Sequence, residues 1–107
     1  MISRAIWGHY DYESHIIKPG YEYTLLAWIR YDSAEDIKIR FKTDKTCNLV
    51  VGLRDCSTDR IYASKAVSCT ANQVINVPIK LGAGKAVHPF ILNTSGFSVN
   101  VSTMVSI

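Results

Sequence analysis

Carboxylate side chains come close together at one place in the sequence where their spacing is compatible with catalysis. Asp11 and Glu13 are two residues apart, so on a strand they share one face. A glycosidase needs two carboxyl groups about 5 Å or about 6.5–9.5 Å apart across its substrate. The pair meets this spacing only loosely, near the edge of a small domain where no deep cleft is indicated. We therefore expect a protein without enzymatic activity.

Other catalytic or metal-binding arrangements have no support in the residue order. His9, His15 and His88 lack the paired spacing of metal ligands. Residue order alone cannot place a Ser-His-Asp or Cys-His arrangement, and glycine loops that bind phosphate are absent. We expect no cofactor and no metal ion.

The basic residues have one concentration, at Lys38, Arg40, Lys42 and Lys45. Aromatic side chains that could stack on bases are missing between them, and the net charge of +3 is mild. The sequence also contains no run of 18 apolar residues. Neither a nucleic-acid partner nor a membrane is therefore expected.

The aromatic residues gather near the start of the chain. Seven of the eleven lie within the first 31 positions: Trp7, Tyr10, Tyr12, Tyr21, Tyr23, Trp28 and Tyr31. Sugar rings present C–H groups that pack on the electron-rich faces of such rings. Trp7 precedes the first predicted strand and is a candidate for an exposed platform, whereas Trp28 is either a platform or covered by a loop. Tyr21, Tyr23 and Tyr31 share a face with aliphatic residues and are expected in the core.

The elements that must position these residues are strands. Apolar and polar residues alternate with a period of two through most of the chain, and helical periodicity is absent. Strands are predicted near residues 9–17, 21–31, 37–42, 49–54, 60–67, 74–81, 87–92 and 97–106. Turn residues recur about every ten positions. This pattern predicts an all-β protein, an antiparallel β-sandwich or jelly roll of seven to eight strands.

The length of 107 residues is enough for a single core, so we expect one domain over residues 1–107, either by itself or as a fragment of a larger protein. Charge is distributed unevenly within it, because no Lys, Arg, Asp or Glu follows Lys85. The last strand is therefore either a central strand with Ser and Thr on its outer face or a surface that meets another subunit.

The three cysteines are Cys47, Cys56 and Cys69. A turn at residues 56–59 would pair the two neighbouring strands antiparallel and place Cys47 opposite Cys69. Cys47 and Cys56 would lie roughly 30 Å apart along one strand and could not bond. Two interpretations stay open: a disulfide between Cys47 and Cys69, and three reduced thiols.

Residues 4–8 (Arg-Ala-Ile-Trp-Gly) and 18–30 (Lys-Pro-Gly-Tyr-Glu-Tyr-Thr-Leu-Leu-Ala-Trp-Ile-Arg) resemble carbohydrate-binding modules of the β-jelly-roll type. The nearest are the xylanase-associated family 22 and the related families 4 and 9. The resemblance covers under a third of the chain and implies a glycan cleft lined by Trp, Tyr, Arg and Glu. It makes Trp7 the stacking residue and Arg4 a donor to sugar hydroxyls. The structural calcium of these modules is not expected, because no carboxylate follows Asp59.

The expected function is that of a non-catalytic carbohydrate-binding module that attaches a larger, extracellular protein to a polysaccharide. The candidate ligand-binding residues are Arg4, Trp7, Glu13, Trp28 and Tyr62, of which Glu13 and Tyr62 match no motif. The alternative is a structural or receptor-binding domain of an oligomeric viral fibre or capsid. In that case a homo-oligomer would form through the uncharged C-terminal strand.

Overall fold

The computed structural model describes the backbone of residues 4–7, 13–25 and 28–106, and the side chains of residues 14–25 and 29–103. Its elements are β1 (Arg4–Trp7), β2 (Glu13–Ile17), β3 (Glu22–Thr24), β4 (Trp28–Tyr31), β5 (Glu35–Thr43), β6 (Cys47–Asp55), β7 (Ile61–Cys69), β8 (Val74–Leu81), β9 (Ala86–Asn93) and β10 (Val99–Ser106). The predicted all-β class is therefore confirmed. The described residues include no helix with the length and hydrophobicity to cross a bilayer.

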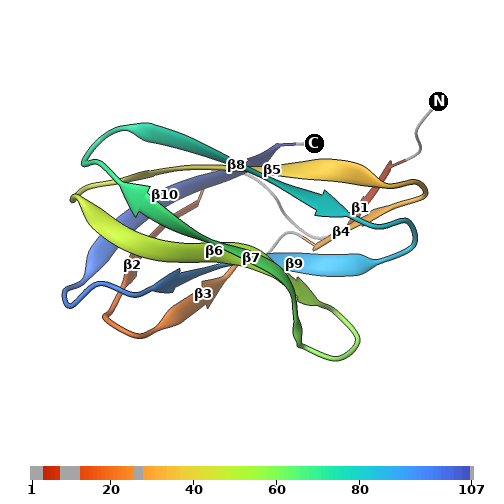
Figure 1. The fold of residues 1–107 in the computed structure, drawn as a ribbon, viewed down its shortest axis with the longest axis horizontal. Helices are drawn as coiled ribbons and strands as arrows, with labels where there is room; N and C mark the ends of the chain where they lie inside the picture. Colours follow the sequence, from red (N-terminus) through yellow and green to blue (C-terminus); the bar gives the residue numbers. More distant parts are fainter. Residues whose placement is uncertain (1–3, 8–12, 26–27, 107) are drawn as a thin grey trace.

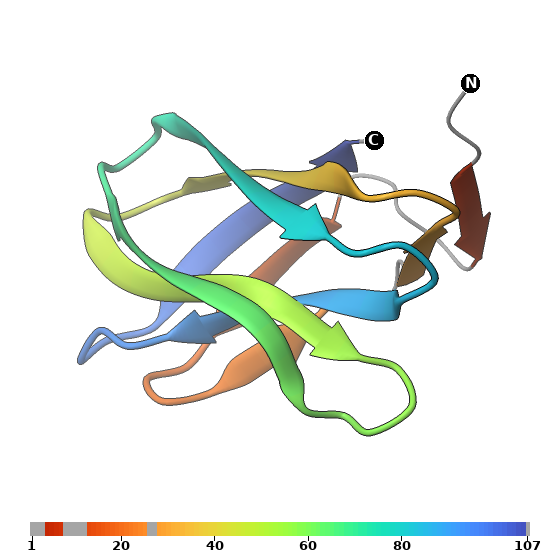
Figure 2. The ribbon, with the colours of Figure 1, turned by 45° about the vertical axis from the view of Figure 1, so that its right-hand side comes forward.

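The strands form two antiparallel sheets that pack face to face (Figure 1, Figure 2). One sheet has the order β1-β4-β9-β6-β7, with β3 also paired to β9, and the other has the order β2-β10-β5-β8. β3 and β4 both pair with β9 and can be counted as two halves of one strand. On that count β2 to β10 are eight strands, four in each sheet, and the chain crosses repeatedly from one sheet to the other. This is the arrangement of a jelly roll, so the predicted sandwich is confirmed.

The strand predicted over 21–31 is interrupted, and the cause lies on β9. Both β3 and β4 pair with β9, but the register shifts by two residues between them. At the interruption the backbone N–H of Leu25 donates to the carbonyl oxygen of Pro89 at 2.9 Å. Proline has no N–H to donate in return, so the ladder of hydrogen bonds cannot continue through this position.

The core lies between the sheets and follows the alternation along each strand. On β5, Ile37, Ile39 and Phe41 are buried, while the residues between them are exposed. Of the three tyrosines expected in the core, Tyr31 is fully buried and Tyr23 packs against the core. The expectation for Tyr21 is wrong: it is 64% exposed, because it lies in the turn before β3, outside the alternating pattern.

The uncharged C-terminal strand is a central strand. β10 pairs with β2 on one side and with β5 on the other, so both of its edges are occupied. Val99, Val101 and Thr103 are buried, and Asn100 and Ser102 lie on the outer face between them. The prediction of a central strand is therefore confirmed, and a contact of its outer face with another subunit stays a prediction.

Candidate functional site

One end of the sandwich is organised by a buried amide, that of Asn93 at the end of β9. Its side chain is fully buried and donates from Nδ2 to the carbonyl oxygens of Ile17 at 2.9 Å and Phe97 at 2.8 Å. Its Oδ1 accepts from the backbone N–H of Ser95 at 2.9 Å. These three bonds fold the segment 94–97 back over the end of the sheet.

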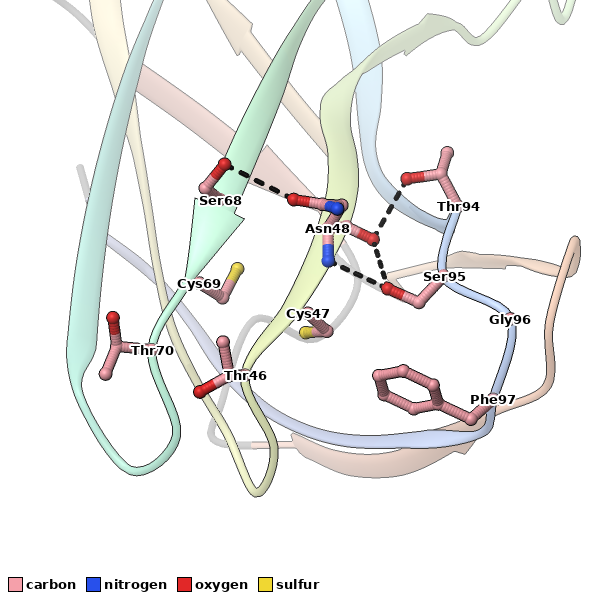
Figure 3. Close-up of a pocket in the computed structure, with 10 residues that line it drawn as sticks. All are labelled: Thr46, Cys47, Asn48, Ser68, Cys69, Thr70, Thr94, Ser95, Gly96 and Phe97. Atoms are coloured by element: carbon pink, nitrogen blue, oxygen red, sulfur yellow. Dashed lines mark hydrogen bonds between the residues drawn. The ribbon is translucent and has the colours of Figure 1, made fainter.

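The folded segment meets the beginning of β6 at Asn48. Figure 3 shows Thr94 and Ser95 approaching Asn48 from one side and Ser68 of β7 from the other. The Thr94 hydroxyl donates to the Asn48 carbonyl oxygen at 2.9 Å, and the Asn48 N–H donates to the Ser95 hydroxyl at 2.8 Å. The Ser68 hydroxyl donates to Oδ1 of Asn48 at 3.3 Å. The contacts bring three segments that are distant in sequence to one place.

These segments enclose an open hollow of about 440 Å³. Its lining consists of Thr46, Cys47, Asn48, Ser68, Cys69, Thr70, Thr94, Ser95, Gly96 and Phe97. The lining is uncharged, and the Phe97 ring, 42% exposed, points into the hollow from the 94–97 segment (Figure 3). Within the described part of the chain, Nδ2 of Asn48 and the hydroxyl of Thr70 have no hydrogen-bond partner. The hollow therefore combines free polar groups with one aromatic face, at a volume typical of small-molecule sites.

The Phe97 ring is held from outside the hollow by Lys45. The ammonium group of Lys45 lies 5.6 Å from the ring centroid and donates to the carbonyl oxygen of Ser98 at 3.1 Å. Because a cation over one face of an aromatic ring is attracted by its electron density, this contact supports the position of the ring.

Two buried thiols form part of the wall. The predicted register is confirmed, because Cys47 and Cys69 are Cα partners of β6 and β7. Both are free thiols in the structure, so the disulfide between them stays a prediction. Burial, the nearby charge that Cys47 would carry and a hydrogen bond between the thiols raise the pKa of Cys69 from 9.0 to about 12. A thiol that ionises so reluctantly is a poor nucleophile, which disfavours thiol chemistry by Cys69 near neutral pH.

This shift predicts a loss of stability at high pH. The unfolded chain releases the Cys69 proton near pH 9.0 and the folded chain near pH 12, so protonation favours the folded state. The contribution is complete below about pH 9 and is lost as the pH rises towards about 12. We expect the urea midpoint of the wild type to fall more between about pH 8 and about pH 11 than that of Cys69→Ala. Equal falls in the two proteins would show that the thiol does not contribute.

The residues proposed from the sequence do not come together at one site. Trp7 and Trp28 are Cα partners on β1 and β4, and Arg4 is the partner of Tyr31. Arg4 and Trp7 are the first and last residues of β1, three positions apart. The side chains of Arg4, Trp7 and Trp28 lie outside the described residues.

The other two proposed residues lie on different elements again. Glu13 is on β2 of the four-stranded sheet, opposite Thr103, and its side chain is also outside the described residues, as is all of Asp11. Tyr62 is on β7, at the opposite edge of the six-stranded sheet from β1. Its hydroxyl accepts a hydrogen bond from the N–H of Gly82 at 2.9 Å, which ties β7 to the turn after β8.

Apart from Cys47 and Cys69, which were considered as a disulfide, the residues of the hollow were not singled out from the sequence, because they lie in turns and at strand ends. The uncharged run Asn93-Thr94-Ser95-Gly96-Phe97 was the available signal, because it carries amide and hydroxyl groups directly before an aromatic ring. Among the described residues no three His, Cys, Asp or Glu side chains are grouped so that they could hold a metal ion. No protein-family model matches the chain, and no curated protein is detectably similar to it.

Proposed function

We propose that this protein is a non-catalytic carbohydrate-binding domain and that the hollow at the end of the sandwich takes a neutral sugar unit. The observation that carries the proposal is the uncharged hollow of about 440 Å³ with an exposed Phe97 ring at its side. A sugar unit would place its C–H face on this ring. Its hydroxyl groups would bind Nδ2 of Asn48 and the hydroxyl of Thr70.

A second contact for a longer glycan would lie at the tryptophan positions. Positions 7 and 28 are Cα partners on β1 and β4. On the same strand as position 28, Arg30 forms an ion pair with Asp32 at 3.4 Å. β4 pairs with β9 near Ala86, whereas the hollow lies beyond Asn93, roughly 23 Å along the strand. The two surfaces can therefore be tested separately.

The test is a glycan array with the wild type, followed by calorimetry with the best ligand. Phe97→Ala is expected to weaken binding by about tenfold or more, because it removes the stacking face of the hollow. Ile61→Ala removes another exposed apolar side chain, 53% exposed and on β7, and is expected to leave binding unchanged. Trp7→Ala measures the tryptophan surface on its own. The proposal fails if no glycan binds, or if Phe97→Ala binds as tightly as the wild type.

The alternative, a domain of an oligomeric fibre or capsid, is supported by the jelly-roll order, which viral capsid domains also use. Because both edges of β10 are paired, a homo-oligomer would have to use the outer face of this strand. That face adjoins exposed cations of β5, with Lys42 opposite Ser102. Packing two copies there would bring like charges together. Light scattering distinguishes the two functions: a monomer supports the binding domain, and a stable trimer supports the fibre.

A further inference from the structure

The outer face of the four-stranded sheet carries a row of cations that the hollow does not use. Lys38, Arg40 and Lys42 alternate along β5 with buried residues and are all exposed. Successive cations are two residues apart, which spaces them by roughly 7 Å and makes the row about 13 Å long. The row is formed by the strand itself, so its spacing does not depend on a loop.

The strands on either side supply no counter-charge to this row. On β8, Pro78, Asn76 and Val74 lie opposite the three cations, and on β10 Ser102 lies opposite Lys42. In the described part of the chain, none of the three cations has a hydrogen bond or an ion pair. An acid lies two residues beyond each end of the row: Asp36 is opposite another cation, Lys80, and Asp44 accepts a hydrogen bond from the backbone N–H of Asn100 at 2.9 Å. The row is thus a strip of three positive charges, bounded by an acid at each end and without an ion pair of its own among the described residues.

Such a strip does not stabilise the fold, because neighbouring like charges repel one another. It would, however, attract a linear partner whose negative charges recur along its length. The cations lie on one face of the sheet along a single strand, so one extended chain could contact all of them.

The neighbouring side chains indicate the chemistry of that chain. Exposed or half-exposed hydroxyl and amide groups flank the row at Ser14, Asn76, Asn100 and Ser102. Ser14 donates to Oδ1 of Asn100 at 3.2 Å across β2 and β10. No aromatic residue lies on the described outer positions of this sheet, whereas proteins that bind single-stranded nucleic acid stack bases on aromatic rings. Hydroxyls and amides suit sugar hydroxyl groups instead.

We propose that this face binds an acidic polysaccharide. Its carboxylate or sulfate groups would pair with Lys38, Arg40 and Lys42, and its hydroxyls would bind the flanking Ser and Asn side chains. The face and the hollow lie on different sheets and use different residues. A failure to bind acidic polysaccharide at this face would therefore leave the proposed sugar site in the hollow untouched. A failure of the sugar site would likewise leave the proposal for this face untouched.

The experiment compares two triple variants with the same loss of charge. The test variant is Lys38→Ser, Arg40→Ser and Lys42→Ser. The control variant is Lys18→Ser, Arg60→Ser and Lys85→Ser, three cations that are exposed and lie away from the row. Circular dichroism confirms that both variants are folded. Binding to alginate and to heparin is then measured by calorimetry at low and at physiological salt.

We expect the wild type to bind at least one of the two polymers, with an affinity that falls as salt rises. The test variant should bind at least about tenfold more weakly, and the control variant within about twofold of the wild type. If both variants lost the same affinity, binding would depend only on net charge, and the proposal would be overturned. So would an absence of binding to both polymers, or equally tight binding of single-stranded DNA through the same three residues.

Discussion

Gly52→Ala is expected to lower the free energy of unfolding by about 3 kcal/mol or more. Gly52 lies in the middle of β6, and a Cβ atom at this position would overlap the carbonyl oxygen of Ala63 and lie 2.8 Å from Cε1 of Phe90. The carbonyl oxygen of Ala63 belongs to the backbone of the neighbouring strand β7, so it cannot rotate away as a flexible side chain could. The sheet would have to open locally to accept the methyl group.

The Phe90 ring is also prevented from moving. Phe90 lies on the outer side of the six-stranded sheet, opposite Gly52, yet it is fully buried. The guanidinium of Arg54 covers the ring, with its Cζ 5.3 Å from the ring centroid. Glu22 holds that guanidinium through two hydrogen bonds, of 2.5 Å to Nε and 2.7 Å to Nη2. The absence of a side chain at Gly52 is therefore what allows this outer cluster to form.

Urea unfolding measures the effect, with Gly96→Ala as the matched control. A Cβ at Gly96 would meet nothing within 4 Å, so this variant is expected to unfold within about 1 kcal/mol of the wild type. If Gly52→Ala were as stable as Gly96→Ala, the close approach of β7 and Phe90 to Gly52 would be disproved.

Asn93→Ala is expected to lower the free energy of unfolding by about 2–4 kcal/mol. The change leaves the carbonyl oxygens of Ile17 and Phe97 and the N–H of Ser95 without the partners that Asn93 gives them. Because the site is fully buried, water cannot easily replace these bonds. The 94–97 segment would also loosen, so binding in the hollow should weaken together with stability.

Asn93→Asp separates the two roles of the amide. Aspartate has the same size and keeps an acceptor for Ser95, but it loses both donated bonds and buries a charge. This variant should be at least as unstable as Asn93→Ala. Asn76→Ala is the control, because Asn76 is exposed and its side chain has no hydrogen bond within the described residues. Unchanged stability in both Asn93 variants would show that the buried amide does not organise the segment.

The local features of the fold were predictable from the sequence. From β2 onward, strand positions follow from the period-two alternation, which depends only on successive side chains pointing to opposite faces. The strand β1 at Arg4–Trp7 was not predicted, and Trp7 lies in it rather than before the first strand. The turn at residues 56–59 set the register of the hairpin, so the pairing of Cys47 with Cys69 follows from the order of the residues alone. Each of these inferences used residues that are close together in the chain.

Features that depend on which strands are neighbours were not predictable in the same way. The interruption between β3 and β4 required the knowledge that β9 lies beside both and carries Pro89 at the critical place. The period-two alternation places Phe90 on the outer face of its sheet, where an exposed side chain is expected. Its burial is explained only by Gly52 and Arg54 on the adjacent strand.

The sequence by itself determined the all-β class, the antiparallel sandwich and the exposed cations of β5, because alternation and turn residues act over a few positions. Only the tertiary structure decided where a ligand could sit. The hollow is assembled from segments 46–48, 68–70 and 94–97, whose approach is set by sheet order and by the hydrogen bonds of Asn93. Contacts between such distant segments leave no periodic signal in the sequence, since each segment alone is an ordinary turn or strand end.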